Sequence, residues 1–314
     1  MNNNRICKIL DIEHPIIMAP MFLVSNVEMI VKALESGISA AFPAMNYRTD
    51  DELRNAIAEI KSQSDKTFGI NLIVNKSNPK YPRQLEICLE AKVGFIITSL
   101  GSPEETIAKA HPAGIKVFCD VTDISYARKV VGLGADAIIA VSAEAGGHAG
   151  DISAKDLITE LRTNFSIPII GAGGVANSDN INDMMSYGAD AVSVGTVFIA
   201  ATECPVSEAY KQALIDYKAK DIVRTSNLSG SPLTVINTPY VQEVGTEASW
   251  MSKMLYKNKK LKKYLKLLIT LRGMHKIQKA AFGASYKSFY VAGPSIEQIH
   301  QIRPLKEIVK DLIK

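Results

Sequence analysis

Two stretches decide the fold: residues 168–174, PIIGAGG, and residues 191–196, AVSVGT. Each is a short apolar run that ends in glycine, and an amphipathic segment of helix length separates the two. Short runs rich in β-branched residues are typical of strands buried on both faces of a parallel sheet, where a helix connects consecutive strands. The two stretches therefore predict consecutive strand–helix units with glycines at the carboxyl ends of the strands.

The same alternation runs through the first two thirds of the chain. Further apolar runs lie at 16–19, 39–42, 68–74, 94–98, 116–119 and 137–141. The segments expected to be helical are 27–35, 51–63, 83–90, 103–110, 124–131, 154–164 and 179–187. Ser25, Ser178 and either Asp50 or Asp51 are the expected helix start residues.

Eight such units permit either an open doubly wound α/β sheet or a closed barrel. The count of eight, and the absence of GxGxxG after the first strand, favour the (β/α)8 TIM barrel. Gly-Ala-Asp occurs at 134–136 and at 188–190, each time just before a strand. This repeat predicts tight helix-to-strand turns at the bottom of the barrel.

The pattern changes after about Val223. Residues 225–246 are rich in Ser, Thr, Pro and Asn and are expected to be irregular, whereas 247–281 carries the leucines and lysines of a helical segment. We predict a barrel from 1–223 and 289–314, with residues 224–288 inserted as a C-terminal helical subdomain over its mouth. A last amphipathic helix is expected at 296–313.

Composition narrows the class of protein. The 314 residues suit a barrel of about 250 residues plus an insertion. A net charge of +4, without a basic stripe, gives no support for nucleic-acid binding. Four cysteines without metal-ligand spacing indicate a reduced, cytoplasmic protein and no metal site. No apolar run approaches the roughly 20 residues that span a bilayer, so no integral membrane segment is expected.

Glycines after the seventh and eighth strands are the candidates for a phosphate site. They are Gly171, Gly173 and Gly174, followed by Gly195 with Thr196. Glycine lets the backbone approach an anion closely, and barrels commonly bind phosphate at these two loops. Ordinary tight turns are the alternative, and two such turns at consecutive strand ends favour phosphate.

His148 is the candidate catalytic residue. It lies in EAGGHAG, residues 144–150, directly after the sixth strand and beside Gly146 and Gly147. Small neighbours at the active face leave the imidazole open to a substrate, and imidazole suits general acid–base chemistry. The other histidines, His14, His111, His275 and His300, are interpreted as ordinary surface or core residues.

Other residues at strand ends could contact a flat ring. Ala19, Pro20 and Met21 follow the first strand and could cover one face of it, although core packing explains them equally well. Asn71, inside the third strand, must either face the mouth or pair internally. Thr98 and Ser99 end the fourth strand and could contribute similarly.

These residues together resemble the nitronate monooxygenase (2-nitropropane dioxygenase) family, which also includes flavin-dependent enoyl-ACP reductases and NADH:quinone reductases. The matching motifs are HPIIMAPM at 14–21, FGIN at 68–71, EAGGHAG at 144–150, GAGG at 171–174, GT at 195–196, TECP at 202–205 and AG at 292–293. The resemblance implies a barrel that binds FMN, with the flavin ring near Ala19, Pro20, Met21 and Asn71. It places the phosphate near Gly173, Gly174, Gly195 and Thr196, and His148 over the flavin.

Four positions depart from the family pattern. Met18 and Pro294 stand where many members have Gln, Asp120 where some have Lys, and Val141 where a polar residue is common. We expect these positions to lie near the flavin or the substrate, so they bear on substrate choice.

Three functions follow as hypotheses. The first is oxidation of alkyl nitronates with O2 to a carbonyl compound and nitrite. The second is reduction of an enoyl thioester or a quinone with NADH or NADPH as electron donor. A non-catalytic flavin-binding protein is disfavoured because a pure binder has no use for His148.

The partners expected are a small-molecule substrate and, under the second hypothesis, acyl carrier protein. Ten basic residues without an acidic one lie between Lys253 and Lys279 and could attract an acidic carrier protein or anionic lipid. A solvated lysine face on an amphipathic helix is the favoured interpretation. The sequence leaves the oligomeric state, including a homodimer, open.

Overall fold

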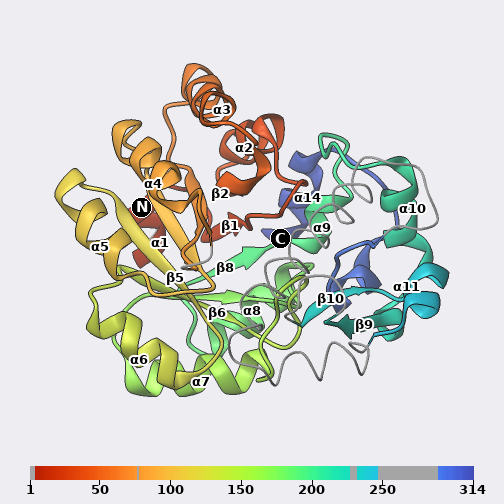
Figure 1. The fold of residues 1–314 in the computed structure, drawn as a ribbon. Helices are drawn as coiled ribbons and strands as arrows, with labels where there is room; N and C mark the ends of the chain where they lie inside the picture. Colours follow the sequence, from red (N-terminus) through yellow and green to blue (C-terminus); the bar gives the residue numbers. More distant parts are fainter. Residues whose placement is uncertain (1–3, 76–77, 227–231, 247–288) are drawn as a thin grey trace, which may run out of the picture.

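The computed structural model describes residues 4–75, 78–226, 232–246 and 289–314. Eight parallel strands form a closed barrel, in which each strand pairs with its neighbour in sequence and the first pairs with the last (Figure 1). The strands are β1 (Ile16–Met18), β2 (Ser39–Pro43), β3 (Gly69–Ile73), β4 (Phe95–Ser99), β5 (Lys116–Val121), β6 (Ala137–Val141), β7 (Ile169–Ala172) and β8 (Ala191–Val194). The predicted (β/α)8 barrel is confirmed.

Seven helices alternate with these strands and cover the outside of the barrel. They are α2 (Val27–Glu35), α3 (Asp50–Gln63), α4 (Tyr81–Glu90), α5 (Glu104–Ala110), α6 (Ile124–Gly132), α7 (Ala154–Asn164) and α8 (Ser178–Ser186). Short 3-10 turns follow β2, α5 and α10, namely η1 (Ala44–Asn46), η2 (His111–Ala113) and η3 (Ala219–Asp221).

The predicted N-caps Ser25 and Ser178 were wrong by one position, whereas the prediction that Asp50 or Asp51 opens a helix is confirmed. Asn26 caps α2, where its side chain accepts a hydrogen bond of 2.8 Å from the Met29 amide, and Asn177 rather than Ser178 caps α8. Thr49 caps α3, with Asp50 as the first helical residue. Ser25 has another use, because its hydroxyl accepts from the Met21 amide at 2.9 Å and holds the loop after β1.

Helix α1 (Arg5–Leu10), which the sequence analysis missed, closes the bottom of the barrel. Its buried side chains Ile6, Cys7 and Leu10 form one apolar cluster with side chains of the barrel interior, among them Phe95 and Phe118. The two phenyl rings stack with their centroids 4.9 Å apart. The interior is therefore a packed core rather than a channel.

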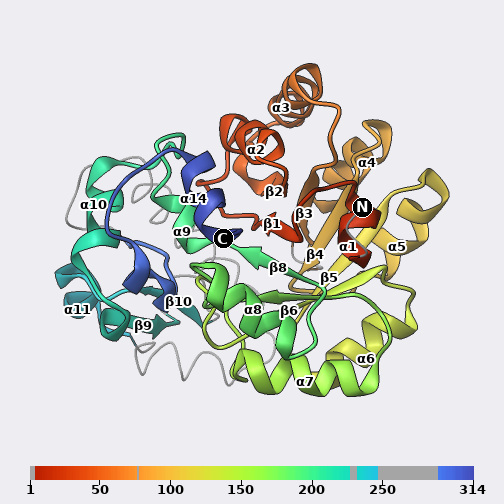
Figure 2. The ribbon, with the colours of Figure 1, turned by 180° about the vertical axis from the view of Figure 1, so that it is seen from behind.

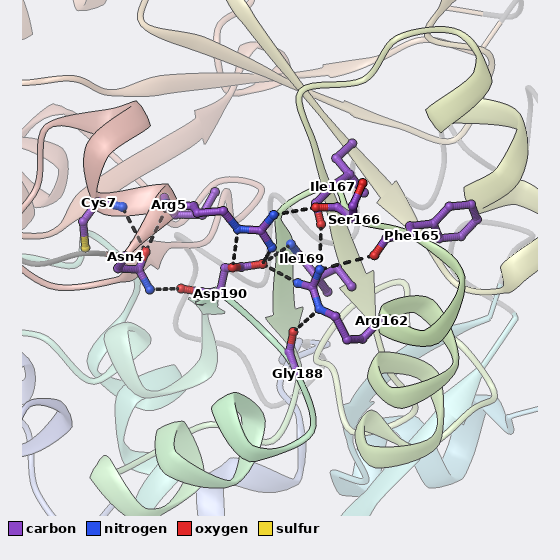
Figure 3. Close-up of polar contacts among 11 residues, drawn as sticks. Asn4, Arg5, Cys7, Arg162, Phe165, Ser166, Ile167, Ile169, Gly188 and Asp190 are labelled. Carbon is purple, nitrogen blue, oxygen red and sulfur yellow. Dashed lines mark hydrogen bonds and ion pairs between the residues drawn. The ribbon is translucent and has the colours of Figure 1, made fainter.

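Asp190 fixes α1 to the barrel (Figure 3). Its carboxylate accepts from Arg5 Nε at 2.8 Å, from the Ile169 amide at 2.8 Å and from a terminal nitrogen of Arg162 at 2.5 Å. The Asn4 side chain donates to the Asp190 carbonyl. One carboxylate thus connects α1, α7 and β7.

Both Gly-Ala-Asp sequences form the predicted turns before β6 and β8. Gly134 and Gly188 have φ values of +94° and +111°, which glycine adopts without strain. The aspartates then act alike, since Asp136 accepts from the Val117 amide at 2.9 Å as Asp190 does from Ile169. Each carboxylate ties the start of one strand to the start of the preceding one.

The C-terminal elements gather on one side of the barrel, away from α4 and α5 (Figures 1 and 2). They are α9 (Thr196–Ile199), α10 (Glu208–Asp216), β9 (Ile222–Thr225), β10 (Leu233–Ile236), α11 (Pro239–Val244), η4 (Pro294–Gln298) and α14 (Leu305–Leu312). The expected final helix at 296–313 is split into η4 and α14. The latter packs on α2 and α8, against the barrel wall.

The irregular segment expected at 225–246 was wrong in part. β9 and β10 pair antiparallel, and Leu233, Val235, Val241 and Phe289 form a small apolar cluster of their own. The predicted boundary after residue 223 falls inside β9. Residues 247–288, with most of the predicted helical subdomain and its lysines, lie outside the described residues, so the division into two parts stays a prediction.

Two further observations apply to the described residues. None of their helices has the length and apolarity needed to cross a lipid bilayer. Cys7, Cys88, Cys119 and Cys204 are all buried, and no disulfide joins them.

Candidate active site

The loop that carries His148 is anchored to the neighbouring strand β7. Ser142, fully buried at the end of β6, donates from its hydroxyl to the Ala172 carbonyl at 3.0 Å. The Ser142 carbonyl in turn accepts from the Gly150 amide at 3.2 Å. The loop is thus closed on itself below His148, whose own side chain is exposed. A fixed loop with an accessible imidazole suits a residue that meets a substrate.

The β9–β10 hairpin holds the same loop from the other side. The Thr234 amide donates to the Gly147 carbonyl at 2.8 Å, and Arg224 donates to the Gly150 carbonyl and to Asp151. The sequence analysis missed Arg224 and Thr234, because no spacing links residues so far from the motif. They are positioning residues for the loop rather than groups that reach a substrate.

Gly173 and Gly174 form a backbone turn that no other residue fits easily. Their φ values are +114° and +77°. A Cβ atom on Gly173 would lie 2.4 Å from Ser142 Oγ and 2.6 Å from the Ala145 nitrogen. The turn therefore lies directly against the loop that carries His148, as the two motifs predict for one common site.

Gly195 and Thr196 lie between the loop after β1 and residues 292–293. A Cβ atom on Gly195 would lie 3.7 Å from both Ala19 Cβ and Met21 Sδ. The Thr196 hydroxyl accepts from the Gly293 amide at 3.0 Å. Gly146 also abuts this segment, since a Cβ atom there would lie 2.8 Å from the Gly293 nitrogen. The loops after β1, β6 and β8 therefore converge with residues 292–293.

The loop of Ala19, Pro20 and Met21 is held by backbone contacts. The Ala19 amide donates to the Val194 carbonyl at 2.8 Å, which extends the pairing of β1 with β8. All three residues are partly exposed. They are thus free to offer an apolar surface beside Gly195, which is consistent with the predicted ring contact.

Gly171 and Thr98 face away from this convergence. A Cβ atom on Gly171 would lie 3.0 Å from Ile158 and Met184, which belong to α7 and α8. The Thr98 hydroxyl lies 3.3 Å from Cys119 Sγ, on the side of the strands that faces the helices. Their role as cofactor contacts stays a prediction.

Asn71, Ser99 and Asp120 form a hydrogen-bonded chain across β3, β4 and β5. Asn71 Nδ2 donates to Ser99 Oγ at 2.7 Å, and Ser99 Oγ donates to Asp120 Oδ2. Asn71 Nδ2 also lies 3.2 Å from the Ile97 carbonyl. Burial raises the pKa of Asp120 to about 6, although the hydrogen bond from Ser99 opposes this shift. Asn71 pairs internally, and its partner Ser99 follows Phe95 and Ile97 on the interior face of β4.

The family departures fall in different places. Val141 packs against the barrel interior and Pro294 begins η4 next to Gly293. Met18 is fully buried between the strands and the helices, so its expected place near the flavin is wrong. Strand alternation explains this, because Ile17 and not Met18 faces the interior.

A closed barrel of eight parallel strands, with an exposed histidine and glycine turns at the carboxyl ends of the strands, is typical of (β/α)8-barrel enzymes, whose active sites lie at that end. In the described part of the chain, no group of three or more His, Cys, Asp or Glu is arranged to hold a metal ion. The chain belongs to the nitronate monooxygenase family, a family of flavin-dependent oxidoreductases, since that family's model matches residues 77–314.

Individual relatives agree with this assignment. The nitronate monooxygenase of Paraburkholderia phytofirmans is 30% identical over 270 residues, which cover 71% of this chain and 73% of that protein. The (3aS,4S,5R,7aS)-5-hydroxy-7a-methyl-1-oxo-octahydro-1H-indene-4-carboxyl-CoA dehydrogenase of Rhodococcus jostii is 27% identical over 237 residues, or 76% of this chain, but only 66% of the relative's length is matched. The structure of FabK from Thermotoga maritima superposes with a TM-score of 0.86 at 28% identity, covering 100% of this chain and 96% of FabK.

Proposed function

We propose that this protein binds FMN and oxidises alkyl nitronates with O2 to a carbonyl compound and nitrite. The observation that carries the proposal is the direct contact between the Gly173–Gly174 turn and the loop of His148, at Ser142 and Ala145. This contact joins a site for a phosphate to a site for acid–base chemistry. Membership of the nitronate monooxygenase family supports the choice of substrate.

The residues present fit FMN. Gly173 and Gly174, with Gly195 and Thr196, would hold the phosphate through backbone amides, because glycine lets the backbone approach an anion closely. Ala19, Pro20, Met21 and Asn71 would contact the ring. FMN supplies the redox chemistry when bound. His148 would bind the nitronate anion when protonated or accept a proton when neutral.

A second candidate is reduction of an enoyl thioester or a quinone with NADH or NADPH. The similarity to FabK over the whole chain and to a dehydrogenase of a CoA thioester favours a thioester substrate. Acyl carrier protein would then be the partner. A cytoplasmic location and a homodimer remain predictions for either candidate.

An anaerobic absorbance scan separates the two candidates. We expect the purified protein to be yellow and an alkyl nitronate, but neither NADH nor NADPH, to bleach the flavin band. The neutral nitroalkane is the matched control for the anion. Rapid bleaching by NADH or NADPH would favour the second candidate instead. A colourless protein that takes up no FMN would contradict both.

Gly173→Ala tests the phosphate turn. A residue with a side chain is strained at φ +114°, and its Cβ would displace Ser142 or Ala145. Such backbone strain costs about 1–3 kcal/mol, so we expect the dissociation constant for FMN to rise about tenfold or more. Flavin fluorescence in a titration of the apoprotein measures this.

Gly132→Ala is the control, because a Cβ there meets nothing within 4 Å. Equal FMN affinity of the two variants would remove Gly173 from the phosphate site.

A further inference from the structure

Asp120 is an unusual residue for the place it occupies. The eight barrel strands, all of them described, contain two charged residues, Lys116 and Asp120. Lys116 is exposed at the beginning of β5, at the bottom of the barrel. Asp120 lies near the carboxyl end of β5, at the face where the site's loops converge, and is only partly exposed. Burying a carboxylate costs free energy, so a role for it is expected in the site.

The Asp120 side chain faces the interior of the barrel and opens toward the mouth. Phe118, two residues earlier on the same face, belongs to the buried interior cluster with Ile97 and Ile139. In the register of the sheet, Asp120 lies beside Ile139. Because apolar side chains fill the barrel below it, Asp120 lies at the mouth end of the barrel interior.

The hydrogen-bonded chain points toward this carboxylate. A hydroxyl has one proton to give, and Ser99 gives it to Asp120 while accepting from Asn71. Asn71 is the ring-contact residue that the family resemblance implies. Asp120 is therefore connected to the expected position of the flavin through Ser99 and Asn71.

The surroundings of Asp120 shift the pKa of its carboxyl group toward neutral pH. Burial raises the pKa of its carboxyl group to about 6, and Ser99 lowers it again in part. The titratable groups of the described residues that sense Asp120 are Cys119 and Tyr126. Burial raises the pKa of each to about 12, so both stay neutral. Additional negative charge nearby would raise the pKa of Asp120 further, because it disfavours the ionised form.

We propose that Asp120 takes up a proton from water when the bound flavin is reduced and releases it on reoxidation. This inference rests on the FMN site proposed above. The reducing substrate delivers two electrons and one proton as a hydride, and the ring gains one negative charge. The Asp120 carboxylate then takes one proton from water to become a neutral carboxylic acid. No other bond is made or broken at Asp120.

Proton uptake during anaerobic photoreduction of the holoenzyme tests the proposal in weakly buffered solution with a pH indicator. At about pH 7 we expect the wild type to take up about one proton per flavin more than Asp120→Asn. At about pH 5, where Asp120 is protonated before reduction, the difference should disappear. Photoreduction needs no substrate, so the result does not depend on which reaction the enzyme catalyses.

Two further variants keep the test decisive. Asp183→Asn makes the same charge change on the exposed face of α8 and should match the wild type. Ser99→Ala removes the hydrogen bond that lowers the pKa of Asp120, so its proton uptake should fade at a higher pH than in the wild type. Equal uptake by wild type and Asp120→Asn at about pH 7, or an unshifted profile in Ser99→Ala, overturns the inference. A protein without flavin contradicts the proposed function as well, and its absorbance shows this before reduction begins.

Discussion

His148→Ala keeps its bound flavin and loses turnover by about 10²–10⁴-fold, the usual contribution of general acid–base catalysis. The side chain is exposed, and Ser142, Thr234 and Arg224 hold its loop through atoms other than the imidazole. The truncation should therefore leave the loop and the glycine turn intact. Steady-state rates with the substrate that bleaches the flavin, together with the flavin content per protein, measure both parts of this prediction.

His300→Ala is the matched control, because His300 is also exposed but lies outside the loops of the site. It should keep wild-type turnover. If His148→Ala retained full turnover, His148 would have no part in the chemistry. If it lost the flavin instead, His148 would be a cofactor contact.

Asp190→Ala should lower the free energy of unfolding by about 1–3 kcal/mol, the typical cost of leaving hydrogen-bonding groups without their partner. The Asp190 side chain is only 15% exposed and receives hydrogen bonds from Arg5, Arg162 and the Ile169 amide. Without the carboxylate, the amide and Arg162, which is itself 28% exposed, lose their shared acceptor. Equilibrium denaturation, followed by far-ultraviolet circular dichroism, measures the loss.

Two further variants test the size of this loss of stability. Asp190→Asn keeps one acceptor oxygen and should lose less stability than the alanine variant. Asp183→Ala, an exposed position on α8, should stay within about 0.5 kcal/mol of the wild type. A loss in Asp190→Ala no larger than in Asp183→Ala would mean that the network around α1 adds nothing to stability.

The barrel could be predicted because its strands are buried on both faces. Runs such as 137–141 and 191–194 are apolar except for Ser193, and glycine or aspartate marks where each begins or ends. Cap positions were less certain, because Ser25 and Asn26 are equally good caps and only the geometry shows which oxygen reaches the helix. The β9–β10 hairpin was missed because its strands are stabilised by Phe289, which is distant in sequence.

The site was predictable where a backbone conformation demands a particular residue. Gly173 and Gly174 are such positions, since their φ values exclude most side chains. Contacts between strands were not predictable, because they depend on register and on which face a residue takes. Thr98 and Ser99 show this. They are neighbours in the sequence, yet Thr98 faces the helices whereas Ser99 donates a hydrogen bond to Asp120 on the interior side.

The pairing of β1 with β8 has a consequence for how the chain acquires its structure during translation. Ile16 of β1 pairs with Val192 of β8, so one edge of β1 stays unpaired until β8 has been synthesised and pairs with it. Contacts so distant in sequence slow folding, and an uncovered strand edge invites association with other chains. The barrel can therefore close only after Val194, the last residue of β8, has left the ribosome. We expect the nascent chain to depend on chaperones until then.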